Sequence, residues 1–447
     1  MNFIVIMSDT FRRDHLGAYG NNWIHTPALN KFAKEATVFD RYYTASFPTL
    51  PNRSDLFTGQ YTFLTRSWDS FPRKVPHLPI YFYHEGYVTQ LIHDTPHLEN
   101  EGNHYDRGWM GWEWVRGQEI DRAPTIANVE IEYPAAREKL RFDAQITDQE
   151  LRNVYFRQFE SDWTTAQVVD KACKWLEYNY KADNFLLWLD IFDPHESFMA
   201  PEYFTERYYP GYKGDKIITP HYGPVGDVTK SELKYIQAAY AGEVTFVDKY
   251  IGWLLRKVED LQLMDDTTII FMTDHGFYLG DHGLLGKSNR TGPFPFFEQI
   301  THIPMMIKTP GKRMKKRCSA VIQPPDILPT MLDLAGAKMP EGLHGRSFKA
   351  VLEGKSYSGR NIAPMSHGIY DDMHALERRH TISTKTHAVL IGPDGAKPEL
   401  YDLRTDPEQR KNVFKKQKDV AKRICGQFRK FLREHDAYHE RVEKILV

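Results

Sequence analysis

The sequence predicts an α/β fold built around a parallel β-sheet. Four short, mostly apolar runs carry this prediction, because strands that helices cover on both faces are continuously hydrophobic. The runs are Asn2–Met7, Val88–His93, Asn184–Ile191 and Thr267–Met272. Polar residues follow each run directly. Since ligands of open α/β sheets bind beyond the carboxyl ends of the strands, we expect functional residues just after each run.

The composition is that of a globular protein and excludes several kinds of partner. The chain has 447 residues, 41% of them hydrophobic and 26% charged, which suffices for a large core with a further subdomain. A net charge of −1 gives no sign of nucleic acid or an anionic membrane as partner, and no apolar stretch is long enough to span a bilayer. Cys173, Cys318 and Cys425 are far apart and odd in number, so a reducing compartment is expected. No signal-peptide pattern is visible, so a cytoplasmic location is expected.

The first run ends in Ser8, Asp9 and Thr10. Its position makes Asp9 a candidate metal ligand, and the alternative is an aspartate that caps the next turn. Further on, Thr26–Ala33 predicts a helix with proline in its first turn, and Val38–Tyr43 predicts a short strand.

Thr49 precedes Pro51 and a segment that predicts a helix. The start of a helix leaves backbone N–H groups free and carries a partial positive charge, so an anion can bind there. A hydroxyl at this place, with Arg53 one turn inside, could attack or hold a tetrahedral anion. The alternative is a threonine that caps the helix beside a surface arginine.

The second run ends in Asp94, Thr95, Pro96 and His97. Alternation along a strand places His93 and Thr95 on one face, although both histidines could equally be polar residues of a surface loop. Residues 105–165 form a candidate insertion that begins with a tryptophan-rich stretch, which predicts either a substrate mouth or a packed loop. This insertion could cover the site or mediate assembly into a homo-oligomer.

The third run ends in Asp193, Pro194 and His195. His195 could act as a general acid or hold an anionic oxygen, because the charge of histidine is adjustable near neutral pH, and a structural histidine is the alternative. Beyond it, Ser231–Leu263 predicts one long helix with a buried apolar stripe.

The fourth run ends in Asp274 and His275. Together with Asp9, this adjacent pair gives two carboxylates and one imidazole, a mixed set that suits Zn or Mn better than Ca. A glycine-rich stretch then leads to Lys287, which could neutralise an oxyanion on the substrate. A solvated lysine is the alternative.

Taken together, these strand ends resemble the sulfatase family of the alkaline phosphatase superfamily. The family signature is Cys or Ser, any residue, Pro, any residue, Arg, and then a run that ends Leu-x-Thr-Gly. The chain matches this signature and the other family segments in order along nearly its whole length. The matching segments are Ile4–Asp9, Gly17–Gly20, Thr26–Leu29, Leu50–Arg53, Leu56–Gly59, Asp193–His195, Thr273–Gly276, Gly286–Lys287, Pro325–Leu332 and Glu399–Leu403.

The resemblance implies a large α/β sandwich around a mixed, mostly parallel sheet, with a smaller C-terminal sheet and a closing helix. We place the catalytic domain at residues 1–370 and the C-terminal subdomain at residues 371–447. The resemblance also implies one divalent metal ion and a small anionic ester as substrate.

The departures from the family pattern concern the chemistry. Thr49 stands where sulfatases carry the Cys or Ser that becomes formylglycine. Thr10 replaces a second metal-binding Asp, Thr95 replaces a Lys, and His275 stands where many sulfatases have Asn. An Asp-His pair with Thr in place of that Lys is similar to the phosphonate monoester hydrolase/phosphodiesterase branch, although that branch keeps formylglycine.

The resulting hypothesis is a hydrolase of phosphodiesters or phosphonate monoesters that uses unmodified Thr49 as nucleophile. Its predicted metal ligands are Asp9, Thr49, Asp274 and His275, and its predicted catalytic residues are Thr49, Arg53, His195 and Lys287. His93, Thr95 and His97 are the predicted substrate contacts. The alternatives are a sulfuric ester hydrolase that works without formylglycine and an inactive metal-binding protein.

Overall fold

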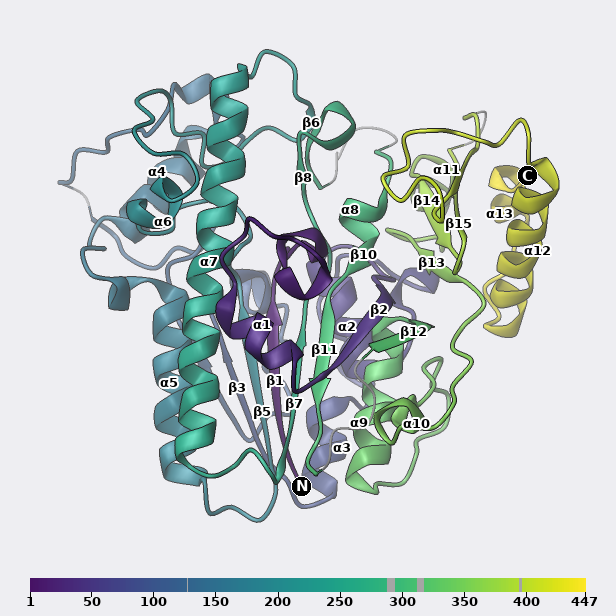
Figure 1. The fold of residues 1–447 in the computed structure, drawn as a ribbon, viewed down its shortest axis with the longest axis horizontal. Helices are drawn as coiled ribbons and strands as arrows, with labels where there is room; N and C mark the ends of the chain where they lie inside the picture. Colours follow the sequence, from purple (N-terminus) through teal and green to yellow (C-terminus); the bar gives the residue numbers. More distant parts are fainter. Residues whose placement is uncertain (127, 288–293, 312–316, 394–395) are drawn as a thin grey trace.

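A large twisted β-sheet forms the centre of the molecule (Figure 1). The computed structural model describes residues 1–126, 128–287, 294–311, 317–393 and 396–447. Within these residues the sheet has nine strands in the order β10-β2-β11-β7-β1-β5-β3-β4, with β12 beside β2. The strands are β1 (Asn2–Ser8), β2 (Thr37–Tyr43), β3 (Val88–His93), β4 (Gly111–Trp114), β5 (Phe185–Ile191), β7 (Thr267–Met272), β10 (His302–Ile303), β11 (Met305–Lys308) and β12 (Arg317–Ile322).

The four strands predicted from the apolar runs are neighbours. They run parallel in the order β7-β1-β5-β3, and Val5 of β1 pairs with Trp188 of β5 and Ile270 of β7. Strand β11 is antiparallel to both β7 and β2, so the sheet is mixed and mostly parallel, as predicted. The carboxyl ends of the four strands therefore meet at one edge.

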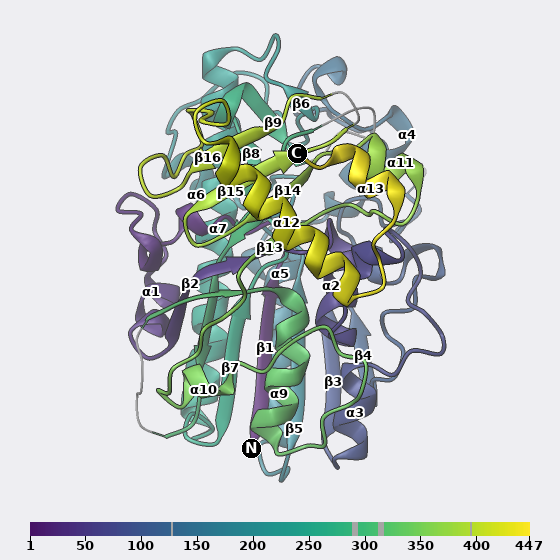
Figure 2. The same cartoon turned by 90° about the vertical axis from the view of Figure 1, so that its right-hand side faces the viewer.

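Both faces of the sheet are buried, which explains why the four parallel strands are mostly apolar. Ile4 and Ile6 of β1 point into one core, and Phe3, Val5 and Met7 point into the other, because successive side chains of a strand alternate between faces. Helices α1 (Pro27–Ala33), α5 (Thr164–Asn179) and α7 (Lys230–Asp260) cover the first face, and α2 (Thr49–Thr58), α3 (Leu78–His84), α9 (Ile327–Ala335) and α10 (Lys349–Leu352) cover the second (Figures 1 and 2).

The long helix α7 confirms the predicted helix of this region and has a defined start. Thr229 and Glu232 form a reciprocal capping box, with the Thr229 hydroxyl accepting from the Glu232 amide at 3.2 Å and the Glu232 carboxylate accepting from the Thr229 amide at 2.8 Å. Such a cap satisfies two otherwise unpaired backbone donors.

A smaller antiparallel sheet follows near the C-terminus and confirms the predicted second sheet with its helix (Figure 2). Its core packs against one face of α12. The buried residues of this face recur at helical spacing from Ala421 to Leu432. The division at residue 370 stays a prediction, and the first strand of this sheet lies before it. The elements are β13 (Ala363–Met365), β14 (His380–Ser383), β15 (His387–Ile391), β16 (Glu399–Asp402), α12 (Lys418–Glu434) and α13 (Glu440–Ile445).

The insertion over residues 105–165 contains a strand that the sequence did not predict. Its tryptophan-rich part was expected as a loop or a substrate mouth, but Gly111–Trp114 forms β4, which extends the sheet beyond β3. The other α-helices and strands are α4 (Ala144–Val154), α6 (Glu202–Glu206), α8 (Glu298–Thr301), α11 (Asp372–Leu376), β6 (Gly223–Pro224), β8 (Tyr278–Leu279) and β9 (Leu284–Gly286). Among the described helices, none combines the length and the apolar character needed to cross a bilayer.

Candidate active site

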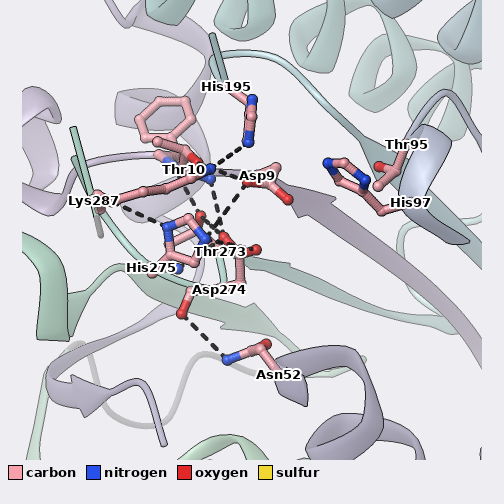
Figure 3. A network of polar contacts seen from close by, with 12 residues as sticks. Asp9, Thr10, Asn52, Thr95, His97, His195, Thr273, Asp274, His275 and Lys287 are labelled. Carbon is pink, nitrogen blue, oxygen red and sulfur yellow. Dashed lines mark hydrogen bonds and ion pairs between the residues drawn. The ribbon is translucent and has the colours of Figure 1, made fainter. Parts of the chain in front are cut away.

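The polar residues that follow the four parallel strands converge on one site. Figure 3 shows Asp9 after β1, Thr95 and His97 after β3, His195 after β5, and Asp274 and His275 after β7. The site is therefore a direct consequence of the strand order, because neighbouring parallel strands end at the same edge of the sheet.

Asp9, Asp274 and His275 form a compact cluster that could hold a cation. One ligand atom from each lies within 4.8 Å of the others, and all three side chains are fully buried. His275 donates its Nδ1–H to the Gly276 carbonyl at 3.1 Å, so its Nε2 carries a lone pair. That Nε2 lies 3.5 Å from Asp274 Oδ2 and 4.0 Å from Asp9 Oδ1.

The donor set of this cluster fits a divalent metal ion. Within the described part of the chain, Asp9 Oδ2 and His275 Nε2 are buried without a hydrogen-bond partner, which is costly unless a ligand satisfies them. Burial, together with the charge of Asp274, raises the pKa of Asp9 well above its usual range. Burial also lowers the pKa of His275 to about 3, so the imidazole is neutral as a metal ligand must be. Two carboxylates and one imidazole favour Zn or Mn over Ca.

The guanidinium group of Arg53 compensates the negative charge of this cluster. Its side chain is 0% exposed and contacts Asp274 directly, with Asp9 at 3.1 Å and Asp190 at 2.8 Å. Burial by itself would raise the pKa of Asp274, but Arg53 outweighs it and holds that pKa below the usual range. The expectation of a surface arginine at this position is therefore wrong.

Helix α2 brings Thr49 to the same place. Thr49 is the first residue of α2, with Pro48 before it, and its side chain is buried. Arg53 follows one turn later, so the two side chains share a face of the helix. Asn52 donates from its side chain to the Asp274 carbonyl at 3.2 Å (Figure 3), which ties the first turn of α2 to the cluster of Asp9, Asp274 and His275.

Asp190 is a site residue that the sequence reasoning missed. It lies within β5, fully buried, and accepts hydrogen bonds from both Arg53 and the Thr95 hydroxyl, the latter at 2.8 Å. The signal was a single carboxylate inside an otherwise apolar strand, since a charge is buried there only when it is paired.

Lys287 is not solvated, because only 6% of the residue is exposed. Its ammonium group contacts His195 Nε2 and lies 3.5 Å from the Thr10 hydroxyl, which in turn donates to Asp9 at 2.7 Å (Figure 3). His195 donates its Nδ1–H to the Glu196 carbonyl. Burial and then the charge of Lys287 lower the pKa of His195 well below its usual range, so His195 is neutral.

The three residues predicted as substrate contacts have different surroundings. His97 extends toward the cluster (Figure 3), and its Nε2 lies 3.1 Å from Glu119 Oε2, a residue of the insertion that the sequence reasoning did not single out. Thr95 is held on Asp190. His93 donates its Nδ1–H to the Thr95 carbonyl at 3.2 Å and stacks on Trp114 with the ring centroids 6.1 Å apart.

The burial of His93 predicts an acid-sensitive fold. Burial lowers the pKa of His93 to about 4, against about 6.5 in an unfolded chain. As the pH falls, the unfolded state therefore binds the extra proton before the folded state does. The contribution of neutral His93 to the unfolding free energy is complete above pH ~6.5 and is lost as the pH falls toward about 4.

We expect His93→Gln to remove up to ~3 kcal/mol of the difference between the unfolding free energies at neutral and acid pH. Urea unfolding at both pH values measures this difference, and the exposed His84, changed to Gln, is the control. An unchanged pH dependence in His93→Gln would contradict the assignment.

Comparison with known proteins gives consistent matches. The family model described as "Sulfatase" matches residues 1–337, and the model "N-sulphoglucosamine sulphohydrolase, C-terminal" matches residues 280–437. Among curated proteins, Arylsulfatase K of Gallus gallus is 26% identical over 92% of this chain and 78% of its own length. An arylsulfatase of Clostridium perfringens is 26% identical over 92% of this chain and 90% of its own.

A solved structure shows the same fold. The phosphonate monoester hydrolase of Agrobacterium radiobacter superimposes with a TM-score of 0.74 at 20% identity, over 97% of this chain and 96% of that one. The large mixed sheet with a small C-terminal sheet is therefore an architecture already seen in experimental structures.

Proposed function

The chain belongs to the sulfatase family and is a hydrolase of ester bonds, and we propose that it cleaves phosphodiesters or phosphonate monoesters with unmodified Thr49 as nucleophile. The main support for this proposal is the position of Thr49. It is buried at the first turn of α2, one turn before Arg53 and tied to the metal-binding cluster through Asn52, where the family signature has Cys or Ser.

The chemistry of threonine favours phosphorus over sulfur. In sulfatases the Cys or Ser at this position becomes formylglycine, and its hemiacetal releases sulfate by breaking a C–O bond. Oxidation of threonine, a secondary alcohol, would give a ketone rather than an aldehyde, so this release route is closed. A phosphothreonine can instead be resolved by water that attacks phosphorus.

The site residues divide into metal-binding and catalytic roles. Asp9, Asp274, His275 and Thr49 would hold one divalent ion, Mn or Zn in preference to Ca. When bound, such an ion supplies positive charge that lowers the pKa of a hydroxyl and stabilises anionic oxygens of the substrate. Arg53 orients the start of α2 and balances the carboxylates.

The remaining residues would act on the substrate. Lys287 stabilises the leaving oxygen, and His195, which accepts from Lys287, holds the ammonium group in place. Thr95 and His97 contact the substrate. His93 supports them through the Thr95 carbonyl.

The balance of charge favours a singly charged substrate. Arg53 faces three carboxylates, Asp9, Asp190 and Asp274. Arg141 faces two, Glu119 at 3.2 Å and Glu196 at 2.9 Å. Since both guanidinium groups are already neutralised, the charge available for a substrate is small. A diester or phosphonate monoester, with one negative charge, suits this site better than a dianionic monoester.

A sulfuric ester hydrolase that works without formylglycine is the second candidate. The names of the curated relatives and of the C-terminal family model favour it. An inactive metal-binding protein is the third candidate function. The buried pairing of Arg53 with the carboxylates of the cluster argues against this candidate, because a site without activity would not need that pairing.

Parallel assays test the proposal. An aryl phosphodiester, an aryl phosphonate monoester and an aryl sulfate that share one leaving group are compared with added Mn or Zn. We expect the highest kcat/KM on one of the two phosphorus esters. Dominant sulfate turnover by protein whose Thr49 is unmodified by mass spectrometry would establish the second candidate instead. Activity on none of the three, with metal bound, would favour the third.

The imidazole of His275 predicts the metal preference. In His275→Asn an oxygen donor replaces the nitrogen ligand, which favours harder cations. We expect the Zn or Mn affinity to fall by about 10-fold or more, with Ca affected less. Titrations of chelator-treated protein followed by thermal unfolding measure both affinities. Unaltered Zn and Mn binding in the variant would exclude His275 as a ligand.

A further inference from the structure

Glu119 occupies an unusual position in the insertion. Its backbone has a φ of 40°, which is unfavourable for a residue with a side chain and persists only where the surroundings impose it. The neighbouring Gln118 anchors this part of the insertion, because its side-chain amide donates to Asp193 at 2.8 Å and to Thr164 at 2.7 Å. Strained backbone at such a place is a common sign of function.

The strained backbone turns the Glu119 carboxylate inward onto His97. Glu119 is 4% exposed, with Oε2 3.1 Å from His97 Nε2 and Oε1 3.2 Å from Arg141. Burial opposes ionisation, but the hydrogen bond and charge of His97, followed by the charge of Arg141, lower the pKa of Glu119. A buried carboxylate on one imidazole nitrogen fixes the tautomer and the orientation of the ring.

His195, the histidine that the sequence suggested as general acid, is unsuited to donating a proton. His195 gives its Nδ1–H to the Glu196 carbonyl, and its Nε2 accepts from Lys287. Lys287 is in turn held between His195 and the Thr10 hydroxyl. His97 has no such cationic partner on its ring nitrogens in the described structure, and its nearest charged contact is Glu119.

We propose that His97, held by Glu119, gives the proton to the leaving oxygen, so that Glu119 is the positioning residue for this step. The inference rests on the proposed function, because it concerns the leaving group of the same ester. It assigns His97 a role beyond substrate contact, and it gives the insertion a part in catalysis.

The proton balance of the two steps is simple. Thr49 Oγ bonds to phosphorus and releases its proton to solvent, while the bond from phosphorus to the leaving oxygen breaks. His97, cationic at the start, gives its Nδ1 proton to that oxygen and keeps Nε2–H on Glu119. Water then attacks phosphorus and gives a proton to His97, and Thr49 Oγ leaves and is reprotonated from solvent. The net reaction converts the ester and water into the alcohol and either a phosphate monoester (from a phosphodiester) or a phosphonic acid (from a phosphonate monoester).

Several elements contribute charged groups around His97. Glu119 and Arg141 come from the insertion, His195 and Glu196 follow β5, and Lys287 follows β9. The rings of Trp68 and Phe192 lie against His97 with centroids 5.0 and 5.7 Å away. Glu119 is the carboxylate that directly contacts His97 among the described residues.

The test uses the dependence on the leaving group, which a purely structural role would not change. Phenyl and 4-nitrophenyl phosphodiesters are compared, because phenolate needs protonation to leave and 4-nitrophenolate does not. In Glu119→Gln we expect kcat/KM to fall about 100-fold for the phenyl ester and by less than about 3-fold for the nitrophenyl ester. Glu150→Gln is the matched control: Glu150 is a buried glutamate of the same insertion that accepts from Ser197 rather than contacting His97.

Equal losses on both esters would overturn the inference. If wild type cleaves neither phosphodiester, the matching pair of aryl phosphonate monoesters replaces them. If wild type cleaves no phosphorus ester, the proposed function fails, and the matching pair of aryl sulfates tests Glu119 in the same way. Protein labelled with 15N-histidine gives a readout without any substrate, and His97→Gln identifies the His97 signals. We expect the wild-type signals to report an Nε2–H that is hydrogen-bonded to Glu119 and that bond to be weaker in Glu119→Gln, and a wild-type His97 without a hydrogen-bonded Nε2–H would refute the role of Glu119.

Discussion

Thr49→Ala is expected to reduce kcat/KM for the preferred phosphorus ester by about 10⁴-fold or more. The alanine variant keeps the helix start but lacks the oxygen that attacks, so the two-step route is closed. Because Thr49 is buried at the first turn of α2, the loss of one hydroxyl and one methyl group should leave the fold intact. Steady-state kinetics with a thermal melt of each variant measures both effects.

Thr49→Ser is the matched control for this prediction. Serine keeps the hydroxyl and removes only a methyl group, so we expect at least about a tenth of wild-type activity. An alanine variant that retained wild-type turnover would show that Thr49 is not the nucleophile. Metal content is measured in parallel, since Thr49 is also a proposed ligand.

Arg53→Met is expected to cost about 3–5 kcal/mol of unfolding free energy in metal-free buffer. Arg53 contacts Asp9, Asp190 and Asp274, all completely buried, and methionine would leave these carboxylates without a counter-charge. Activity should fall at the same time, because Arg53 supports the start of α2. Chemical denaturation compares this variant with Arg256→Met, whose side chain is 68% exposed and pairs only on the surface, and which should change stability by less than ~1 kcal/mol.

The stability of Arg53→Met is also measured with added metal. A divalent ion on Asp9 and Asp274 would replace part of the lost charge, so we expect Mn or Zn to restore some stability to Arg53→Met. A variant as stable as wild type without metal would contradict the view that Arg53 compensates the buried carboxylates.

The sequence was sufficient for the central sheet because its strands are buried on both faces. Asn2–Ser8 and Thr267–Met272 are buried throughout and mostly apolar, and such runs are recognised by local pattern. Strand β4 was missed, since Gly111–Trp114 is a short edge strand that is only partly buried and lacks this pattern. The small C-terminal sheet followed from the family resemblance rather than from periodicity.

The strand-end rule located most of the candidate site. It placed Asp9, Asp274 and His275 correctly together, because adjacent parallel strands end side by side. It could not locate Asp190, which lies inside a strand, or Glu119, whose approach to His97 depends on the path of an irregular insertion. The lone carboxylate of Asp190 in an apolar strand is a local signal that this residue is paired, but it does not name the partner. The contact between Glu119 and His97 is set by tertiary packing and leaves no local signal.

The central claim is that unmodified Thr49 attacks the ester. The most direct measurement is mass spectrometry of the peptide that contains Thr49, before the reaction and after acid quenching during turnover of the aryl phosphonate or phosphodiester. The account predicts an unmodified threonine before the reaction and a phosphorus adduct on Thr49 during it, absent from Thr49→Ala. An adduct on another residue, or an oxidised Thr49 in the resting protein, would contradict it.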